Sequence, residues 1–320
     1  MLTSATAAKA RERFQPLSAA RLEVVERFDL ASVSDPRSLA DELAGAWAVV
    51  ADSANRFDDG MLSRLPNLRV IARTGVGYDA IDVAAAAGRG VVVFTTPGTL
   101  TESVADYAVA LMLAALRDVP GADAAVRSGV WRAPRIGRDL SGATVAVVGF
   151  GAIGRAVARR LLGFDCRIIA VDPHISDDAG AQLGVTRLSL GEALPLADVV
   201  TLHVALTPET RGLVGRRELA LLRPSAVLVN TSRGAVIDEP ALVDALRRGA
   251  LAAAALDVFE REPLPADHPL AALPNVVLSG HVASSSLASI ARMCDAAVAG
   301  ILAVARGEVP TGCLDPEVLR

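Results

Sequence analysis

Aromatic side chains are scarce in this chain of 320 residues, at 3% of the total. Proteins that stack the bases of single-stranded nucleic acid need such side chains. The net charge of −4 also lacks the basic footprint of a nucleic-acid binder. No uninterrupted apolar run reaches the roughly 18 residues of a membrane span. The composition therefore predicts neither a nucleic-acid partner nor a membrane partner.

Cysteine is also rare. Cys166, Cys294 and Cys313 are far apart and form no CxxC pair. This usage suits a reducing compartment and predicts neither a disulfide framework nor a metal site. The first residues, MLTSATAAKARERF, contain no apolar core of the length found in signal peptides. Together these features predict a cytoplasmic protein.

Hydrophobic residues are abundant, at 52%, which is enough for two domains with large cores. Short runs rich in Val, Ile and Leu alternate with longer helical patterns. Runs without strict alternation are typical of parallel strands buried on both faces. The fold class is therefore α/β, with two doubly wound parallel-sheet (Rossmann-like) domains. The predicted strands are 22–25, 46–50, 68–72, 91–94, 144–148, 167–171, 197–203, 226–230, 251–257 and 275–279.

Two joints divide the chain. Thr99 and Glu102 form a capping-box pattern that opens a helix through about Arg117. This helix is apolar on nearly all sides, so we expect it to be buried between the domains. A second helical pattern, over 290–307, leads back to the first domain. We expect a discontinuous first domain, 1–99 completed by 284–320, and a second domain at 100–283.

A glycine-rich turn marks a dinucleotide site in the second domain. Gly149, Gly151 and Gly154 form a GxGxxG pattern between the strand 144–148 and a helix. The glycines permit a tight turn, and the helix N-terminus can hold a pyrophosphate. Asp172 ends the next strand, where its carboxylate can bind ribose hydroxyls and repel a 2′-phosphate. We therefore expect an NAD-binding domain; the alternative is a glycine-rich turn without a ligand.

A second glycine pattern, Gly75-Val76-Gly77, also follows a strand. No acidic residue ends the next strand, so we reject this pattern as a nucleotide site. Its backbone amides either form a nest for a carboxylate, which makes the first domain substrate-binding, or belong to a plain turn. Arg73 could meet a second anionic group of the substrate; alternatively it turns outward or pairs with an acid such as Asp79.

Several polar residues follow strands of the second domain, at the edge where α/β sheets bind ligands. Hydride transfer to or from a secondary alcohol needs an acid/base, for which we select His281, and a carboxylate beside it, Glu262. Arg233 can bind the substrate carboxylate and polarise its carbonyl. Burial of Asp257 is costly without hydrogen bonds, which favours a ligand contact. His203 either borders the cofactor or is structural, and solvated or structural roles remain open for the others.

At these residues the chain resembles the D-isomer-specific 2-hydroxyacid dehydrogenases. The resemblance rests on RTGVGYDAID at 73–82, the glycine fingerprint, LTPET at 206–210, NTSRG at 230–234, LDVFEREP at 256–263 and the strand before His281. It implies that Arg233, Glu262 and His281 are catalytic. It further implies that Asp257 holds the nicotinamide carboxamide and that the Gly75–Gly77 loop takes the substrate carboxylate. By the same resemblance Thr231 and Ser232 line the nicotinamide pocket, and Ala152 and Ile153 lie under the pyrophosphate.

The resemblance implies an NAD-dependent enzyme that interconverts a small 2-hydroxy acid and its 2-keto acid, as a homodimer. Two alternatives are a D-3-phosphoglycerate dehydrogenase and a non-enzymatic, NAD-sensing binding protein like the corepressors of this fold. The chain departs from the family at Gly280 and Ala205, where proline is usual. Gly280 should loosen the segment that aims the His281 imidazole and lower the rate.

Overall fold

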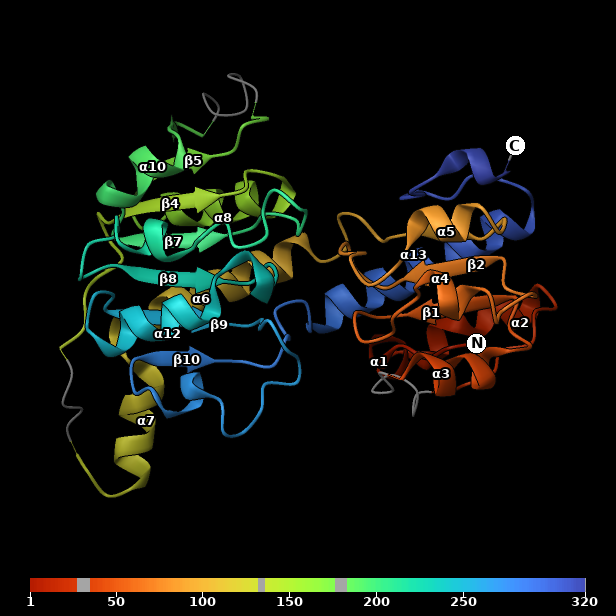
Figure 1. Cartoon of the computed structure of the whole chain (residues 1–320), viewed down its shortest axis with the longest axis horizontal. Helices are drawn as coiled ribbons and strands as arrows, with labels where there is room; N and C mark the ends of the chain where they lie inside the picture. The colour runs from red at the N-terminus through yellow and green to blue at the C-terminus, as the bar shows by residue number, and fades with distance from the viewer. Residues whose placement is uncertain (28–34, 132–135, 176–182, 320) are drawn as a thin grey trace. The chain divides into compact units, whose positions relative to one another are not determined.

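The computed structural model describes residues 1–27, 35–131, 136–175 and 183–319. The chain forms two compact units (Figure 1). The first comprises Met1–Leu100 and Ser285–Arg320, and the second comprises Thr101–Ser284. These boundaries lie one residue from those expected from the sequence.

The first unit is a parallel three-stranded sheet with helices on both faces. Its strands are β1 (Ala48–Ala51), β2 (Val70–Arg73) and β3 (Val92–Phe94), in the order β1-β2-β3. Its helices are α1 (Ala5–Ala8), η1 (Arg11–Phe14), α2 (Gln15–Ala19), α3 (Pro36–Leu43), α4 (Asp59–Leu62), α5 (Val83–Ala87), α13 (Leu287–Ala305) and η6 (Pro316–Leu319). The apolar sides of α3, α4 and α5 bury one face of the sheet, and α13 packs against β2 on the other.

The predicted strand at 22–25 is wrong. In this region only Glu26 makes a β-bridge, a single parallel one to Leu2, and Leu2 bridges onward to Val50. Glu23 and Val25 within the run are exposed, Val25 at 38%, so the run lacks the two-sided burial that a central parallel strand needs. The N-terminal segment therefore extends the sheet by isolated bridges alone.

The second unit contains a parallel seven-stranded sheet in the order β10-β9-β8-β7-β4-β5-β6. Its strands are β4 (Thr144–Val148), β5 (Arg167–Val171), β6 (Thr186–Arg187), β7 (Val199–Leu202), β8 (Val227–Asn230), β9 (Ala253–Leu256) and β10 (Val276–Leu278). Its helices are α6 (Thr101–Arg117), α7 (Val119–Arg127), α8 (Ala152–Leu162), α10 (Leu190–Ala193), η3 (Leu194–Leu196), α11 (Arg216–Leu219), η4 (Gly234–Val236), α12 (Glu239–Arg247) and η5 (Pro269–Ala272). The strand order reverses between β4 and β7, and open α/β sheets bind ligands at such a switch point.

Alternate residues of each central strand enter two different cores. Val145 and Val147 of β4 pack with α6 and α8, whereas Ala146 and Val148 face the core formed with α10, α11 and α12. All four residues are at most 2% exposed. This two-sided burial confirms the doubly wound architecture expected from the continuous apolar runs. The two-residue strand β6 was not predicted, because its sequence contains no apolar run.

Helix α6 has eight buried residues, as its apolar sequence predicts. They pack against α8, β8, β9 and β10, so α6 is a core helix of the second unit itself. The expected capping box is wrong. The Thr99 hydroxyl donates to the Thr96 carbonyl oxygen at 2.7 Å, and the Glu102 carboxylate pairs with Arg159 and Arg160 of α8. Glu102 therefore ties α6 to α8.

Helix α13 is long and apolar enough to cross a membrane by length and composition alone, which was not predicted from the uninterrupted apolar runs. However, 56% of its most apolar 18-residue stretch is buried inside the protein. Its two charged residues are engaged within the first unit, Arg292 with the Thr99 carbonyl oxygen and Asp295 with Arg13. This burial is typical of a core helix.

Candidate active site

The glycine-rich turn after β4 is closely packed against the end of β7. Gly149 has a φ of +88°, and a Cβ atom there would lie 2.7 Å from the backbone carbon of His203. A Cβ at Gly154 would lie 2.1 Å from the Gly149 carbonyl oxygen. Both positions therefore exclude any larger residue, and they bring the ends of β4 and β7 together at the switch point.

The start of α8 fits a pyrophosphate. Gly151 is the N-cap residue, and the space where its side chain would project is open. The first amide to bond within the helix is that of Arg155, to the Gly151 carbonyl oxygen at 3.0 Å. The amides of Ala152, Ile153 and Gly154 precede it, so they present N–H groups at the positive end of the helix dipole. This cradle agrees with the predicted dinucleotide site.

Asp172 follows β5 and supports the same turn. Its Oδ2 atom accepts the Phe150 amide at 2.7 Å, and its Oδ1 atom accepts the His174 amide at 2.8 Å. Each carboxylate oxygen can accept a further hydrogen bond, so these contacts leave room for the ribose hydroxyls. The ribose contact itself stays a prediction. Arg187 of β6 lies against the next residue, since it donates to the Pro173 carbonyl oxygen at 3.3 Å.

His203 lies at the carboxyl end of β7. Its Nε2 atom is 2.9 Å from the Thr201 hydroxyl, and its Nδ1 atom is 3.4 Å from the Thr231 hydroxyl. Burial lowers the pKa of His203 to about 3, so the imidazole is neutral at physiological pH. One nitrogen then donates and the other accepts, which links the end of β7 to Thr231 after β8. Its expected place beside the cofactor stays a prediction.

His281 and Glu262 form a direct pair in the second unit. The His281 Nδ1 atom lies 2.6 Å from the Glu262 Oε2 atom, and both side chains are about one-third exposed. The Glu262 Oε1 atom accepts the Phe259 amide at 3.0 Å. Burial raises the pKa of Glu262, but the His281 bond, the Phe259 amide and the charge of Arg233 together lower it below its usual value. Arg233 is therefore close to this pair, and the structure brings the three predicted catalytic residues together.

Asp257 holds the backbone that carries His281. Its carboxylate is fully buried and accepts the Ser279 hydroxyl and the amides of Val282 and Ala283 at 2.7–2.9 Å. Its carbonyl oxygen accepts the His281 amide at 2.7 Å. These bonds satisfy the buried carboxylate without a ligand. Asp257 therefore positions the backbone around His281, a role that was not predicted from the sequence, where only a ligand contact was expected. That contact stays a prediction.

His281 itself has a φ of +55°, in the left-handed region. This conformation is uncommon for a residue with a side chain and needs support from its surroundings. The bonds to Asp257 supply that support on both sides of the residue. A Cβ at Gly280 would meet nothing within 4 Å, so packing does not require glycine at this departure from the family pattern.

The loop that carries Arg233 is organised by Asn230, which sequence reasoning missed. The Asn230 side chain is fully buried, donates to the Arg233 carbonyl oxygen at 2.9 Å and accepts the Ser232 amide and hydroxyl. The only available signal was an amide residue at the end of an apolar strand. Asn230 thereby orders the backbone of Thr231, Ser232 and Arg233.

In the first unit, the loop after β2 agrees with a partial nest. The Gly75 amide donates to the Thr96 hydroxyl at 2.9 Å. Among the described residues, the amides of Val76 and Gly77 have no hydrogen-bond acceptor, and Val76 is 39% exposed. These two amides could bind a carboxylate, and that role stays a prediction.

Arg73 does not turn outward. It is 6% exposed, and its guanidinium donates to the Gly77 carbonyl oxygen at 3.0 Å and to the Thr74 carbonyl oxygen at 2.6 Å. A Cβ at Gly75 would lie 3.2 Å from the same guanidinium. Arg73 therefore lies beneath the loop and shapes it.

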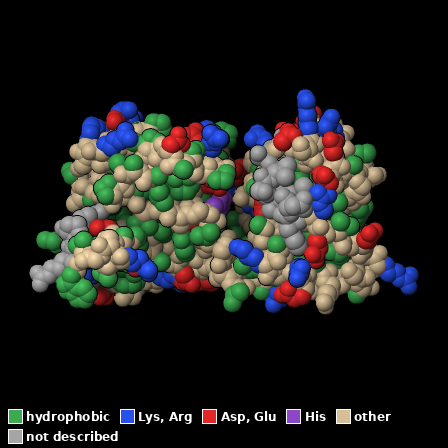
Figure 2. Space-filling view, turned by 90° about the horizontal axis from the view of Figure 1, so that it is seen from below, with side chains coloured by type: hydrophobic (Ala, Val, Ile, Leu, Met, Phe, Trp, Pro, Cys, Tyr) green, Lys and Arg blue, Asp and Glu red, His purple; other side chains and the backbone are tan. Residues whose placement is uncertain are grey.

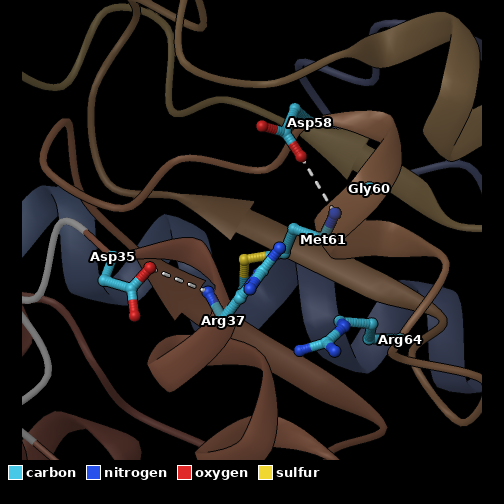
Figure 3. A pocket seen from close by; sticks show the side chains of 6 residues that line it. All are labelled: Asp35, Arg37, Asp58, Gly60, Met61 and Arg64. Atoms are coloured by element: carbon cyan, nitrogen blue, oxygen red, sulfur yellow. Dashed lines mark hydrogen bonds between the residues drawn. The ribbon is translucent and has the colours of Figure 1, made fainter.

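A separate hollow of about 380 Å³ lies in the first unit, at the starts of α3 and α4 (Figure 3). Its acidic residues are occupied as helix caps. Asp35 accepts the Arg37 amide, and Asp58 accepts the Met61 amide at 2.9 Å. The hollow contains none of the predicted site residues. No group of three or more His, Cys, Asp or Glu side chains could hold a metal ion in the part of the chain that the structure describes.

Comparison with known proteins identifies the family. The NAD-binding domain of the D-isomer specific 2-hydroxyacid dehydrogenases matches residues 109–283. A glyoxylate reductase of Korarchaeum cryptofilum is 44% identical over 278 residues, covering 85% of this chain and 84% of the relative. A D-3-phosphoglycerate dehydrogenase of Mycobacterium tuberculosis is 43% identical over 242 residues, covering 75% of this chain but 46% of the relative.

A solved structure supports the same assignment. The NADPH-dependent glyoxylate/hydroxypyruvate reductase of Sinorhizobium meliloti, in complex with NADP and malonate, has a TM-score of 0.84 and 33% identity, covering 97% of this chain and 95% of that one. The fold agrees with that of this solved structure. The chain belongs to the D-isomer specific 2-hydroxyacid dehydrogenase family and is a nicotinamide-dependent oxidoreductase that acts on a CH–OH group.

Proposed function

We propose that this enzyme is an NAD-preferring D-2-hydroxyacid dehydrogenase that reduces small, unphosphorylated 2-keto acids. The observation that supports the reaction type is the His281–Glu262 pair, 2.6 Å apart, with the charge of Arg233 beside it. An imidazole held by a carboxylate can give and take a proton near neutral pH. The nicotinamide, when bound, supplies or accepts the hydride.

The roles of the chain's own residues follow from their chemistry. In reduction, His281 donates a proton to the substrate carbonyl oxygen through its Nε2 atom, because Nδ1 faces Glu262. The Glu262 carboxylate stabilises the imidazolium and fixes the ring orientation. Arg233 binds the substrate carboxylate and polarises the carbonyl. In oxidation, the neutral His281 takes the hydroxyl proton.

The preference for NAD rests on Asp172. Its carboxylate would repel the 2′-phosphate of NADP while accepting bonds from the ribose hydroxyls of NAD. Arg187, which donates to the Pro173 carbonyl oxygen, is a nearby cation that could instead attract the 2′-phosphate of NADP. The relative from Sinorhizobium meliloti uses NADPH, so the two cofactors have to be compared directly.

The preference for an unphosphorylated substrate rests on Arg73. A second anion would need a guanidinium that reaches the substrate, whereas that of Arg73 is buried and donates to two carbonyl oxygens of its own loop. This favours glyoxylate or hydroxypyruvate over 3-phosphohydroxypyruvate, the substrate of the alternative D-3-phosphoglycerate dehydrogenase function.

The test is NADH oxidation with a panel of 2-keto acids. We expect glyoxylate and hydroxypyruvate to be reduced with similar kcat/KM, and 3-phosphohydroxypyruvate to be no better. A phosphorylated substrate that is preferred more than tenfold, with a preference that weakens in salt, would support the phosphoglycerate alternative. No turnover of any 2-keto acid would contradict the proposed reaction.

We propose further that the enzyme is a cytoplasmic homodimer. Helix α7 has no buried residue, and several large apolar side chains on and after it are exposed: Val126 at 55%, Val130 at 51%, Trp131 at 83% and Ile136 at 98%. Figure 2 shows that hydrophobic side chains are present at the surface among the charged ones. Exposed apolar surface of this kind favours a protein partner, here a second copy of the chain.

Sedimentation velocity tests the assembly. We expect a dimer for the parent protein and a monomer after Val126→Glu combined with Trp131→Ser. Both substitutions are at exposed positions, so the fold should be retained. A monomeric parent protein at micromolar concentration would contradict the proposal.

A further inference from the structure

The loop that carries Glu262 is held on its other side by a second carboxylate–imidazole pair. Glu239 is the first residue of α12 and is 8% exposed. Its Oε1 atom lies 3.1 Å from the His268 Nε2 atom, and its Oε2 atom accepts the Glu260 amide at 3.2 Å. A buried carboxylate is stable here because two donors and the helix N-terminus surround it.

The hydrogen bonds of His268 determine which nitrogen carries its proton. The Nδ1 atom accepts the Leu270 amide at 3.3 Å, which caps the short helix η5. Nδ1 therefore has no proton, and Nε2 is the protonated nitrogen that donates to Glu239. The imidazole thus keeps the Glu239 carboxylate in place and leaves its second oxygen for the Glu260 amide.

This second pair connects to the catalytic pair through two adjacent amides. The Phe259 amide donates to Glu262, and the Glu260 amide donates to Glu239. Successive peptide planes share a Cα atom, so fixing the direction of one amide restricts the next. Glu262 in turn holds the His281 Nδ1 atom at 2.6 Å. A displacement of the 259–260 backbone would therefore change the aim of the imidazole.

We propose that Glu239, supported by His268, is a positioning residue for the Glu262–His281 pair. The proposal rests on the proposed function, in which His281 transfers the proton. It goes beyond a stabilising role for an acid at a helix start, because Glu239 acts through the Glu260 amide on the reacting groups. Its loss should lower kcat and leave cofactor binding intact.

The test compares Glu239→Gln with Glu218→Gln. Glu218 is a matched control, since it also lies in the first turn of a helix, in α11, and accepts an amide, that of Gly215 at 3.1 Å. We expect Glu239→Gln to lower kcat for 2-keto acid reduction about tenfold, the scale of a displaced catalytic group, with KM for NADH changed less than twofold. Glu218→Gln should change neither. Equal kcat values for Glu239→Gln and the parent would overturn the proposal.

Two further comparisons separate positioning from general destabilisation. Replacing Glu239 in a Glu262→Gln background should have little additional effect on kcat, because its action passes through Glu262; additive losses would contradict this. His268→Gln keeps an N–H donor near Glu239 and should retain most of the activity, whereas His268→Leu should resemble Glu239→Gln.

A readout without turnover distinguishes failure of this inference from failure of the proposed function. The Nδ1 proton shared by His281 and Glu262 should give a downfield proton resonance in the parent protein, assigned by its loss in His281→Ala. We expect Glu239→Gln to shift or broaden that resonance and Glu218→Gln to leave it unchanged. An unaltered resonance in Glu239→Gln would overturn the positioning role, even if no 2-keto acid were reduced.

Discussion

Gly234 gives the sharpest quantitative prediction, because it separates two parts of the active site. It follows Arg233, and a Cβ atom at this position would lie 1.8 Å from the Phe259 carbonyl carbon and 2.3 Å from the Glu260 nitrogen. Real Cβ contacts are essentially never shorter than 3.0 Å. In Gly234→Ala the Arg233 and Phe259 backbones must therefore move apart by about 1 Å or more, since neither neighbour is a flexible side chain.

The two consequences have different magnitudes. Overpacking of this kind costs about 1–3 kcal/mol of stability, which corresponds to a fall in Tm of roughly 2–10 °C for a unit of this size. Displacement of Arg233 from Glu262 by about 1 Å should lower kcat/KM roughly 100-fold. The loss of activity should thus persist at temperatures where the variant is fully folded.

Thermal unfolding and NADH oxidation with glyoxylate measure both effects on the same preparation. Gly191→Ala is the matched control, because a Cβ at Gly191 of α10 would meet nothing within 4 Å. We expect it to keep the parental Tm and rate. A Gly234→Ala variant with parental activity would refute the view that close contact between the two backbones sets the catalytic geometry.

Other substitutions test individual roles. His281→Ala should lower kcat by roughly 10²–10⁴ with NADH affinity nearly unchanged, and parental turnover would remove His281 as the acid/base. Arg233→Ala should raise KM and lower kcat, at a combined loss of about 2–4 kcal/mol in kcat/KM; a change in KM alone would limit Arg233 to binding. Asp172→Ser should narrow the preference for NADH over NADPH, and should also weaken NADH binding because the Phe150 amide loses its acceptor; equal use of both cofactors by the parent would refute the preference. For His203, the folded-state pKa of about 3 lies below the unfolded value of 6.5, so the folded state binds fewer protons between these two pH values. The free energy of unfolding should therefore fall as the pH drops below about 6.5. The free energy of unfolding of the parent should fall by about 2 kcal/mol between pH 6.5 and pH 5, and urea unfolding of His203→Gln should show a smaller fall. The same pH dependence in both proteins would contradict the neutral imidazole.

The amino-acid sequence alone determined the fold class and named candidates for the reacting groups. Strands buried on both faces must be apolar along their whole length, so β4 and its neighbours were visible as continuous runs. The glycine fingerprint was also readable, because Gly149 and Gly154 occupy positions where backbone atoms leave no room for a Cβ. Local chemistry and spacing therefore predicted the cofactor turn, and chemistry together with the family resemblance selected Arg233, Glu262 and His281 as candidates.

The tertiary structure alone decided which polar groups hold these residues in place. Asn230, Asp257 and Glu239 carry no local pattern that reveals their partners, since each binds a segment that the chain reaches only after a turn or a further strand. The orientation of Arg73 was also decided by the tertiary structure, because its guanidinium donates to the Gly77 carbonyl oxygen beneath its own loop and does not turn outward. Hydrogen bonds depend on distance and direction in space, and only the folded backbone fixes both.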